Sequence, residues 1–335
     1  MEGFGILEDQ GETGRKEYPR SLGHVLNRKV TDKMNYIVFV FLILYAASSN
    51  SQEIKTNILA IEGPELKRAE AYWTKNRIKN ARPFPLINAD EETLIQFQEP
   101  IESWKENGIE INSARADVNE RPFSYNGKFF GTTNDGVDFQ CSASFVKEAE
   151  SENQNIIMTA AHCVRDHRSG HWFGNFLFKR AYNDGGGQDF GINCVGAWDL
   201  YAPAGHAQYD YAFMRTTTDS GVGSLTLIKD IPYDTFTATG YPSNYESGRY
   251  LYQVSGRKFL PTSRTSKVVY MALNPFRGES SGGPWIADLR IGSTEGNYAV
   301  GLNAHPFIRI IPGVKGPYFN DAVLGLYQKV RVCHE

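Results

Sequence analysis

Short apolar runs with strand-like composition recur along the chain from about Pro122 onward. Glycine, asparagine, aspartate and proline separate these runs, as is typical of turns between β-strands. Short strands at such regular spacing predict an all-β domain, either a sandwich or a barrel. The runs are GKFFGT (127–132), CSASFV (141–146), NIIMTA (155–160), DYAFMRT (210–216), FTATGYP (236–242), YLYQVSG (250–256), KVVYMAL (267–273) and YAVGLNA (298–304).

Helical periodicity is clearest at the end of the chain. Segment Asn320–Val332 has apolar residues three or four positions apart, and Asn320 or Asp321 can cap the predicted helix. A weaker helical pattern covers Leu66–Ile78 and ends at the prolines of ARPFPL. It lies in residues 51–120, which are rich in Glu, Lys and Asn. We interpret residues 51–120 as a pro-region or linker, with a small accessory domain as the alternative, and residues 121–335 as the main domain.

One long apolar run, Tyr36–Ala47, stands apart from the β pattern. Its 12 residues are fewer than the about 20 that a membrane-spanning helix needs. Small residues follow it, as in a secretory signal before its cleavage site. With Met34 as the true start, residues 34–50 are a signal peptide and residues 1–33 a misassigned extension. The alternatives are a buried strand or an uncleaved anchor; we expect a secreted, extracellular protein with no stable membrane insertion after signal removal.

Composition and charge narrow the possible partners. The chain has 335 residues, 41% of them hydrophobic and 22% charged, and a net charge of −3. A nucleic-acid-binding surface would need a basic excess, so we expect no nucleic-acid partner. Four cysteines suit an oxidising compartment and allow three pairings. No CxxC pair occurs, so we expect no structural zinc site.

Candidate chemistry lies in three motifs within the β-rich region. TAAHC (Thr159–Cys163) places a histidine at the end of an apolar run. YDYAFM (Tyr209–Met214) places an aspartate at the start of another apolar run. RGESSGGPW (Arg277–Trp285) places two serines in a glycine-rich turn. A serine hydroxyl becomes a strong nucleophile when an imidazole takes its proton, and a carboxylate behind the imidazole fixes the tautomer. His162, Asp210 and one serine can supply these roles. The acids that compete with Asp210 are Asp184, Asp189 and Asp199.

Two adjacent serines compete for the role of nucleophile. The letters G-E-S from Gly278 favour Ser280, whereas S-G-G-P before Trp285 favours Ser281. The residue after the nucleophile must turn away without crowding the acyl group, which glycine allows. Only Ser281 is followed by glycine, so we expect Ser281 to be the nucleophile.

The three motifs resemble those of the chymotrypsin/trypsin-like serine peptidases, in the order histidine, aspartate, serine. The resemblance covers roughly residues 122–333 and implies two six-stranded antiparallel β-barrels with a C-terminal helix. It also implies a disulfide between Cys141 and Cys163, next to His162. Cys194 and Cys333 then pair by elimination, with two free thiols as the alternative.

A narrower likeness points to the V8-like, or glutamyl endopeptidase-like, branch of this family. GYPS (Gly240–Ser243) and GPYF (Gly316–Phe319) are similar to motifs of that branch. YWTKNRIKNARPFP (Tyr72–Pro85) is similar to pro-regions that precede such domains.

The chain departs from the family pattern beside the nucleophile. Glu279 falls on the glycine whose backbone N–H, with that of Ser281, lines the oxyanion hole, so its side chain threatens catalysis unless it points outward. Ser280 falls on the aspartate that pairs with a newly freed N-terminus in trypsin-like members. A serine cannot form that ion pair and no IVGG sequence precedes the barrel. We therefore expect a zymogen whose activation differs from that of trypsin.

Three residues bear on specificity. Pro275 stands six positions before Ser281, where an aspartate would select Lys or Arg, so trypsin-like cleavage is not expected. Asn303 falls where glutamyl endopeptidases resemble one another in having a histidine. His305 lies two residues on, on the same face of a strand, and could read an acidic side chain instead. Glutamyl specificity is the resulting hypothesis.

Together these features predict a secreted, monomeric serine endopeptidase that acts on protein or peptide substrates. His162, Asp210 and Ser281 would form its triad, with an acyl-enzyme intermediate on Ser281. We expect no metal and no organic cofactor. The alternative is a catalytically impaired pseudoprotease, in which Glu279 spoils the oxyanion hole and the fold serves as a binding module.

Overall fold

The computed structural model describes residues 55–84, 111–202, 205–259, 267–308 and 312–333. These residues belong to one unit that runs from Ile54 to the end of the chain. The predicted signal peptide (34–50) and N-terminal extension (1–33) lie outside the described residues, as does the 85–110 part of the predicted pro-region.

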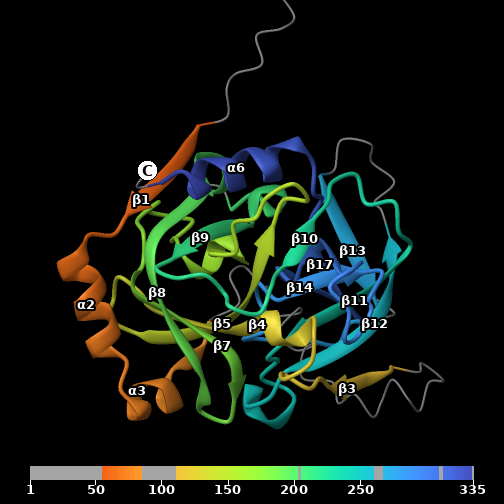
Figure 1. Cartoon of the computed structure of the whole chain (residues 1–335), viewed down its shortest axis with the longest axis horizontal. Helices are drawn as coiled ribbons and strands as arrows, with labels where there is room; N and C mark the ends of the chain where they lie inside the picture. The colour runs from red at the N-terminus through yellow and green to blue at the C-terminus, as the bar shows by residue number, and fades with distance from the viewer. Residues whose placement is uncertain (1–54, 85–110, 203–204, 260–266, 309–311, 334–335) are drawn as a thin grey trace, which may run out of the picture. The chain divides into compact units, whose positions relative to one another are not determined.

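Six antiparallel strands form a closed first barrel (Figure 1). The ladder runs β4–β5–β6–β9–β8–β7 and returns to β4, so no edge is left open. Phe145 packs edge-on against Phe178 and Phe190 in the centre, with ring centroids 5.4 and 5.1 Å apart. The strands are β4 (Asn126–Thr132), β5 (Asp138–Lys147), β6 (Ile156–Thr159), β7 (Gly174–Asn183), β8 (Gly186–Trp198) and β9 (Ala212–Thr216).

A second antiparallel ladder follows in the order β15–β14–β11–β12–β13–β17, with β16 paired to β17. Trp285 lies fully buried at its centre and stacks on Phe236 at 5.8 Å. Short β10 links the two barrels because it pairs with both β5 and β15. The strands are β10 (Leu225–Leu227), β11 (Thr235–Gly240), β12 (Tyr252–Phe259), β13 (Val268–Ala272), β14 (Pro284–Ala287), β15 (Tyr298–Leu302), β16 (His305–Ile308) and β17 (Pro312–Pro317).

The C-terminal helix α6 (Asp321–Arg331) packs on β8 and β9 of the first barrel. The Asn320 side chain caps it by accepting the Ala322 N–H. Both the helix and its cap were predicted, and the double-barrel fold class is confirmed. Short 3₁₀ turns join the strands: η1 (Phe123–Tyr125), η2 (Ala161–Cys163), η3 (Asp199–Tyr201), η4 (Ala207–Tyr209) and η5 (Glu246–Gly248).

Each of the eight predicted runs contains a strand, but the long β7–β8 hairpin was missed. Residues 183–189 form its polar, glycine-rich tip, in which residues from Gly186 onward already pair with β7. The first four residues of β8 are exposed, so they show no apolar alternation that a sequence pattern could reveal.

Residues 55–84 are an integral part of this unit. They comprise β1 (Thr56–Ala60), α2 (Gly63–Tyr72), α3 (Lys75–Asn80) and β2 (Arg82–Pro83); farther on, β3 (Ser113–Arg115) pairs with β12. Strand β1 extends the barrel by pairing with β8, and β2 pairs with β5. Trp73, between the two helices, is 7% exposed and packs on Phe130 of β4 at 5.4 Å. Part of the predicted pro-region therefore contributes to the hydrophobic core.

Two disulfides tie the fold together, Cys141–Cys163 within the first barrel and Cys194–Cys333 between β8 and the residues after α6. The first pair is the one that the family resemblance implied, and the second is the one that followed by elimination. No helix within the described ranges is both long and apolar enough to cross a membrane.

The packing of Trp73 generates a stability prediction. Trp73→Ala should lower the free energy of unfolding by about 3–5 kcal/mol, the usual cost of truncating a buried aromatic side chain. Lys75→Ala, at an exposed position of the adjoining helix, should change it by less than about 0.5 kcal/mol. Denaturant titration of both variants measures the difference. Equal stabilities would mean that residues 55–84 are a detachable segment.

Candidate active site

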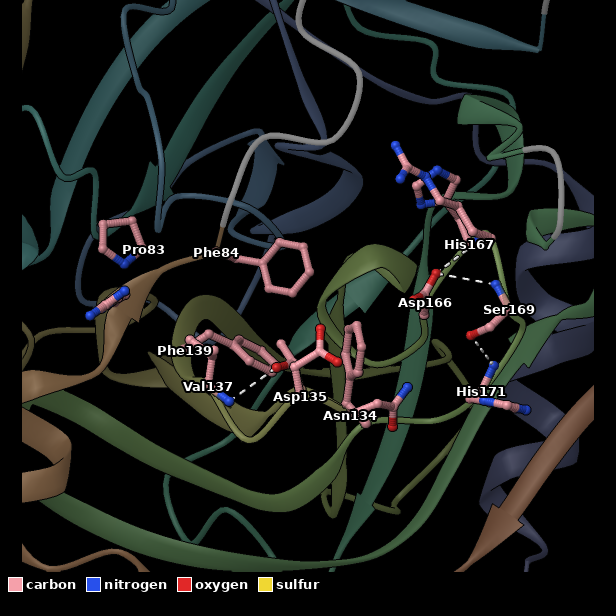
Figure 2. Close-up of a pocket in the computed structure, with 14 residues that line it drawn as sticks. Pro83, Phe84, Asn134, Asp135, Val137, Phe139, Asp166, His167, Ser169 and His171 are labelled. Carbon is pink, nitrogen blue, oxygen red and sulfur yellow. Dashed lines mark hydrogen bonds between the residues drawn. The ribbon is translucent and has the colours of Figure 1, made fainter.

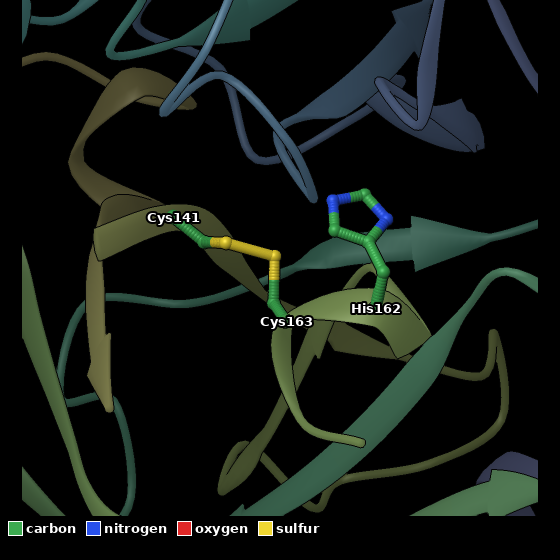
Figure 3. Close-up of side chains that lie close together, drawn as sticks. All are labelled: Cys141, His162 and Cys163. Carbon is green, nitrogen blue, oxygen red and sulfur yellow. A yellow bond between two sulfur atoms is a disulfide. The ribbon is translucent and has the colours of Figure 1, made fainter. Parts of the chain in front are cut away.

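His162 is held at the end of β6 by a short, constrained turn. The strand stops at Thr159, and η2 then carries the histidine between two fully buried residues, Ala161 and Cys163. The disulfide from Cys163 to Cys141 of β5 lies directly beside the histidine (Figure 3). The imidazole is therefore attached to a backbone that has little freedom to move.

Asp210 faces His162 because β9 pairs with β6. Thr159 lies opposite Ala212 in this ladder, so the residues that follow β6 meet those that precede β9. One oxygen of the Asp210 carboxylate accepts the His162 backbone N–H at 2.9 Å, and the other lies 2.8 Å from the ring Nδ1. Both backbone and ring of the histidine are thus fixed by one fully buried carboxylate.

The competing acids are engaged elsewhere. Asp184 lies near Arg249, Asp189 pairs with Lys179, and Asp199 pairs with Arg165. Their side chains are between 38% and 55% exposed, whereas that of Asp210 is 0% exposed. Among the described residues, Asp210 is the acid that contacts His162.

A second histidine approaches the same carboxylate. Nε2 of His305 lies 2.9 Å from Oδ2 of Asp210 but does not meet the geometry of a hydrogen bond. The two imidazole rings are 5.7 Å apart. Burial by itself raises the pKa of the Asp210 carboxyl, but His162 and His305 outweigh it and hold that pKa well below its usual range.

His305 was expected to face the substrate, and the structure places it elsewhere. Strand β15 ends at Leu302 and β16 begins at His305, so Asn303 and His305 are not alternate residues of one strand. The same-face argument fails at this break. His305 turns toward Asp210 and is not among the residues that line the small cavity beside Ser281.

Asn303 is buried and its amide is fully used. Its Nδ2 donates to the carbonyls of Thr239 and Ser280, and its Oδ1 accepts from Asn274 and Trp285. The amide therefore fastens the serine-bearing turn to the core of the second barrel. It has no further donor or acceptor to offer a substrate side chain.

The turn that carries Ser281 packs against the loop of His162. A Cβ added at Gly282 would lie 2.2 Å from Oγ1 of Thr159 and 2.8 Å from the amide nitrogen of Ala160. The Ser281 carbonyl also accepts the Ser142 N–H of β5 at 2.8 Å. Only glycine permits this close approach after the serine, which agrees with the choice of Ser281 over Ser280 from the sequence.

Hydrogen bonds to the neighbouring carbonyls fix the directions of two backbone N–H groups. The Gly278 carbonyl accepts the Ser243 N–H at 2.8 Å, and the Ser280 carbonyl accepts the Gly283 N–H at 2.9 Å. Because the N–H and C=O of a trans peptide point in opposite directions, the N–H groups of Glu279 and Ser281 face away from those partners. Neither N–H donates a hydrogen bond to another described residue.

The Glu279 side chain points toward strand β4 of the first barrel. It is 3% exposed, and its Oε2 lies 3.0 Å from the Nζ of Lys128 in β4. It does not line the cavity beside Ser281, although Gly278 and Ser280 do. A side chain that turns away from the cavity leaves the space next to the Glu279 N–H unobstructed by its own carboxylate.

A small cavity of about 10 Å³ lies beside Ser281. Pro275 is buried and does not line it, and the Pro275 carbonyl accepts from Asn244. The lining combines apolar and polar side chains. The residues that line it are Phe276, Arg277, Gly278, Ser280, Ser281, Asn303, Ala304, Pro306 and Val314.

A larger cavity of about 700 Å³ lies next to Phe84 (Figure 2). Phe84 forms one of its walls and lies 5.5 Å from the imidazole of His162, between ring centroids. His167 and His171 also line this cavity. No local sequence pattern indicates the role of Phe84, because its position depends on β2 pairing with a strand more than fifty residues away.

The cluster around Asp210 has atoms of the kind that bind metal ions. Ligand-type atoms of His162, Asp210 and His305 lie within 4.8 Å of one another. The carboxylate already accepts two N–H groups of His162, so the contacts present are those of a hydrogen-bonded pair. Cys141 and Cys163, also close to His162, are joined in a disulfide and are not free to act as thiolate ligands.

A scan against models of protein families and a search of curated protein sequences gave no match. Among solved structures, protease Anisep from Arthrobacter nicotinovorans is similar at 25% identity and a TM-score of 0.55, over 67% of this chain and 100% of that one. The thermostable serine protease AL20 from an extremophilic microorganism is similar at 27% identity and a TM-score of 0.53, over 63% of this chain and 97% of that one.

A Glu endopeptidase in complex with MPD shares the fold at 17% identity and a TM-score of 0.51, over 66% of this chain and 97% of that one. At this identity the likeness shows the shared fold alone. The two barrels, the contact between His162 and Asp210 and the likeness to the two proteases agree with one another. The chain shares the double-barrel fold of the chymotrypsin/trypsin-like serine peptidases, and its likeness to these two proteases supports that family.

Proposed function

We propose that the protein is a secreted serine endopeptidase that hydrolyses peptide bonds through a triad of His162, Asp210 and Ser281. One observation carries the proposal: the buried carboxylate of Asp210 accepts both the backbone and the ring N–H of His162. This arrangement keeps the proton on Nδ1 and leaves Nε2 as the basic nitrogen. The two disulfides support the secreted location, since such bonds persist in oxidising compartments.

The reaction follows from these roles. Nε2 of His162 takes the proton of the Ser281 hydroxyl while Oγ bonds to the carbonyl carbon of the substrate, and the carbonyl π electrons move to its oxygen. The tetrahedral intermediate collapses, and the leaving amine receives the proton from His162. Water then attacks the acyl-enzyme in the same way, which releases the acid and restores the serine. Asp210 stabilises the imidazolium in both halves without taking its proton.

Two backbone N–H groups would stabilise the oxyanion, those of Glu279 and Ser281. Each such donor is typically worth about 3 kcal/mol of transition-state stabilisation. Their fixed directions and the absence of other acceptors among the described residues support this role.

The pseudoprotease alternative depended on the side chain of Glu279. That side chain lies in an ion pair with Lys128 rather than beside Ser281. We therefore do not favour a catalytically impaired binding module.

A fluorophosphonate probe distinguishes the two adjacent serines. Wild-type protein should be labelled at Ser281, because His162 activates that hydroxyl. Ser281→Ala and His162→Ala should each lose the labelling. Mass spectrometry of the labelled peptide gives the position.

Ser280→Ala is the matched control. It removes a hydroxyl one residue away, and both positions are similarly buried, at 5% and 7% exposure. This variant should be labelled at a rate close to that of the wild type. A folded wild-type protein that never reacts, or a label on Ser280, would contradict the proposed triad.

We further propose that the small cavity, which has room for a group of about the size of a methyl, accepts a small apolar side chain such as that of Ala on the acyl side of the scissile bond. Four apolar residues, Phe276, Ala304, Pro306 and Val314, contribute to its wall. Asn303, one of the two residues expected to recognise an acidic side chain, has its amide fully hydrogen-bonded within the protein, and the other, His305, lies beside Asp210 and does not line this cavity. Glutamyl specificity therefore loses its two candidate residues.

Cleavage-site mapping in a denatured protein mixture tests this specificity. We expect cleavage after small apolar residues, Ala above all, several-fold enriched over Glu and Asp. A clear bias for Glu or Asp would overturn the apolar assignment, and it would leave the triad proposal intact.

A further inference from the structure

We propose that Lys128 is a positioning residue for the oxyanion hole, because its buried ion pair with Glu279 fixes the backbone that carries the Glu279 N–H. This inference rests on the proposed function and concerns the regulation of the same site. In this proposal the oxyanion hole forms when the protein folds, because the cation that fixes the Glu279 backbone is a side chain of β4.

The ammonium of Lys128 lies deep in the protein. The side chain is 2% exposed and lies in a strand whose residues are all buried. Its Nζ donates to Oε1 of Gln140 at 2.7 Å and to Oε2 of Glu279 at 3.0 Å. The rings of Tyr182 and Tyr241 lie 4.9 and 5.7 Å away, within the range of cation–π attraction. A buried charge is tolerated only with such partners, so the position of the ammonium is closely specified.

Glu279 is tethered at both its side chain and its backbone. The carboxylate pairs with Lys128, and the carbonyl accepts the hydroxyl of Ser142 at 2.7 Å. The carboxylate fits only because residue 248 is glycine: a Cβ there would lie 1.9 Å from Oε2 of Glu279. Side chain and carbonyl are therefore both anchored to neighbouring strands of the first barrel.

The anchors compensate for an unfavourable backbone conformation. Glu279 has φ of 67°, in the left-handed region that glycine adopts freely and other residues avoid. Without the Lys128 contact, a residue with a side chain would tend to leave this conformation. The peptide N–H next to Ser281 would then change direction, and the oxyanion would lose a donor.

Each member of the pair depends on the other for its charge. Burial raises the pKa of the Glu279 carboxyl, although Lys128 and Gln140 oppose it. Burial likewise lowers the pKa of the Lys128 ammonium, although Glu279 opposes it. Removal of one partner therefore leaves the other with no counter-charge in a site that disfavours ions.

The same network reaches the N-terminal segment. Nε2 of Gln140 donates to the Ala81 carbonyl at 2.9 Å, at the end of α3. Ser280, which follows Glu279, carries no charge and so cannot pair with a newly created N-terminus. In our proposal the ion pair of Lys128 with Glu279 fixes the turn instead.

Lys128→Met tests the proposal through steady-state kinetics on a peptide ester and the rate of fluorophosphonate labelling. We expect kcat to fall about 10²-fold, the effect of losing one oxyanion donor, with KM changed less than about threefold. Lys179→Met is the matched control, because Lys179 is a buried lysine of the adjacent strand β7 that pairs with Asp189 away from Ser281. It should lose stability but keep the wild-type kcat.

If Lys128→Met does not fold, Glu279→Gln tests the proposal instead, because the amide oxygen of the new side chain can still accept a hydrogen bond from Lys128. We expect its kcat to fall about 10-fold, since a neutral acceptor holds the ammonium less firmly than a carboxylate does. A wild-type kcat in either folded variant would overturn the role of Lys128. If the folded wild-type protein itself neither labels nor hydrolyses the ester, the proposed function fails instead.

Discussion

The buried carboxylate of Asp210 is the interaction on which the rest of the site depends. A fully buried negative charge is costly unless hydrogen bonds and positive groups surround it. The partners here are the backbone and ring of His162, with His305 close to the same oxygen. Much of the local architecture, including the η2 turn and its disulfide, serves to bring these groups to one carboxylate.

The two barrels meet at Ser142. Its N–H donates to the Ser281 carbonyl and its hydroxyl donates to the Glu279 carbonyl, so one β5 residue holds both sides of the serine turn. Lys128, on the adjacent strand, holds the Glu279 side chain from the same barrel. The serine turn is thus positioned from the first barrel while Asn303 fastens it to the second. Our proposals for the triad and the oxyanion hole rest on this shared positioning.

The sequence predicted what depends on short-range patterns. Eight strand segments, the terminal helix and the histidine motif could be recognised because their signals lie within a few neighbouring residues. The β7–β8 hairpin was missed since its exposed, glycine-rich tip lacks alternation. The destinations of the Glu279 and His305 side chains depend on strands distant in sequence, so spacing alone could not give them. Lys128 offered one hint, as a charged residue inside an apolar strand.

Asp210→Asn tests the central claim most directly, through the second-order rate constant for fluorophosphonate labelling of Ser281. The amide preserves the shape of the side chain but lets His162 adopt the wrong tautomer, so the rate should fall by about 10³–10⁴-fold. Asp199→Asn, which alters a partly exposed acid outside the pair, should react like the wild type. An unchanged rate in Asp210→Asn would contradict the account.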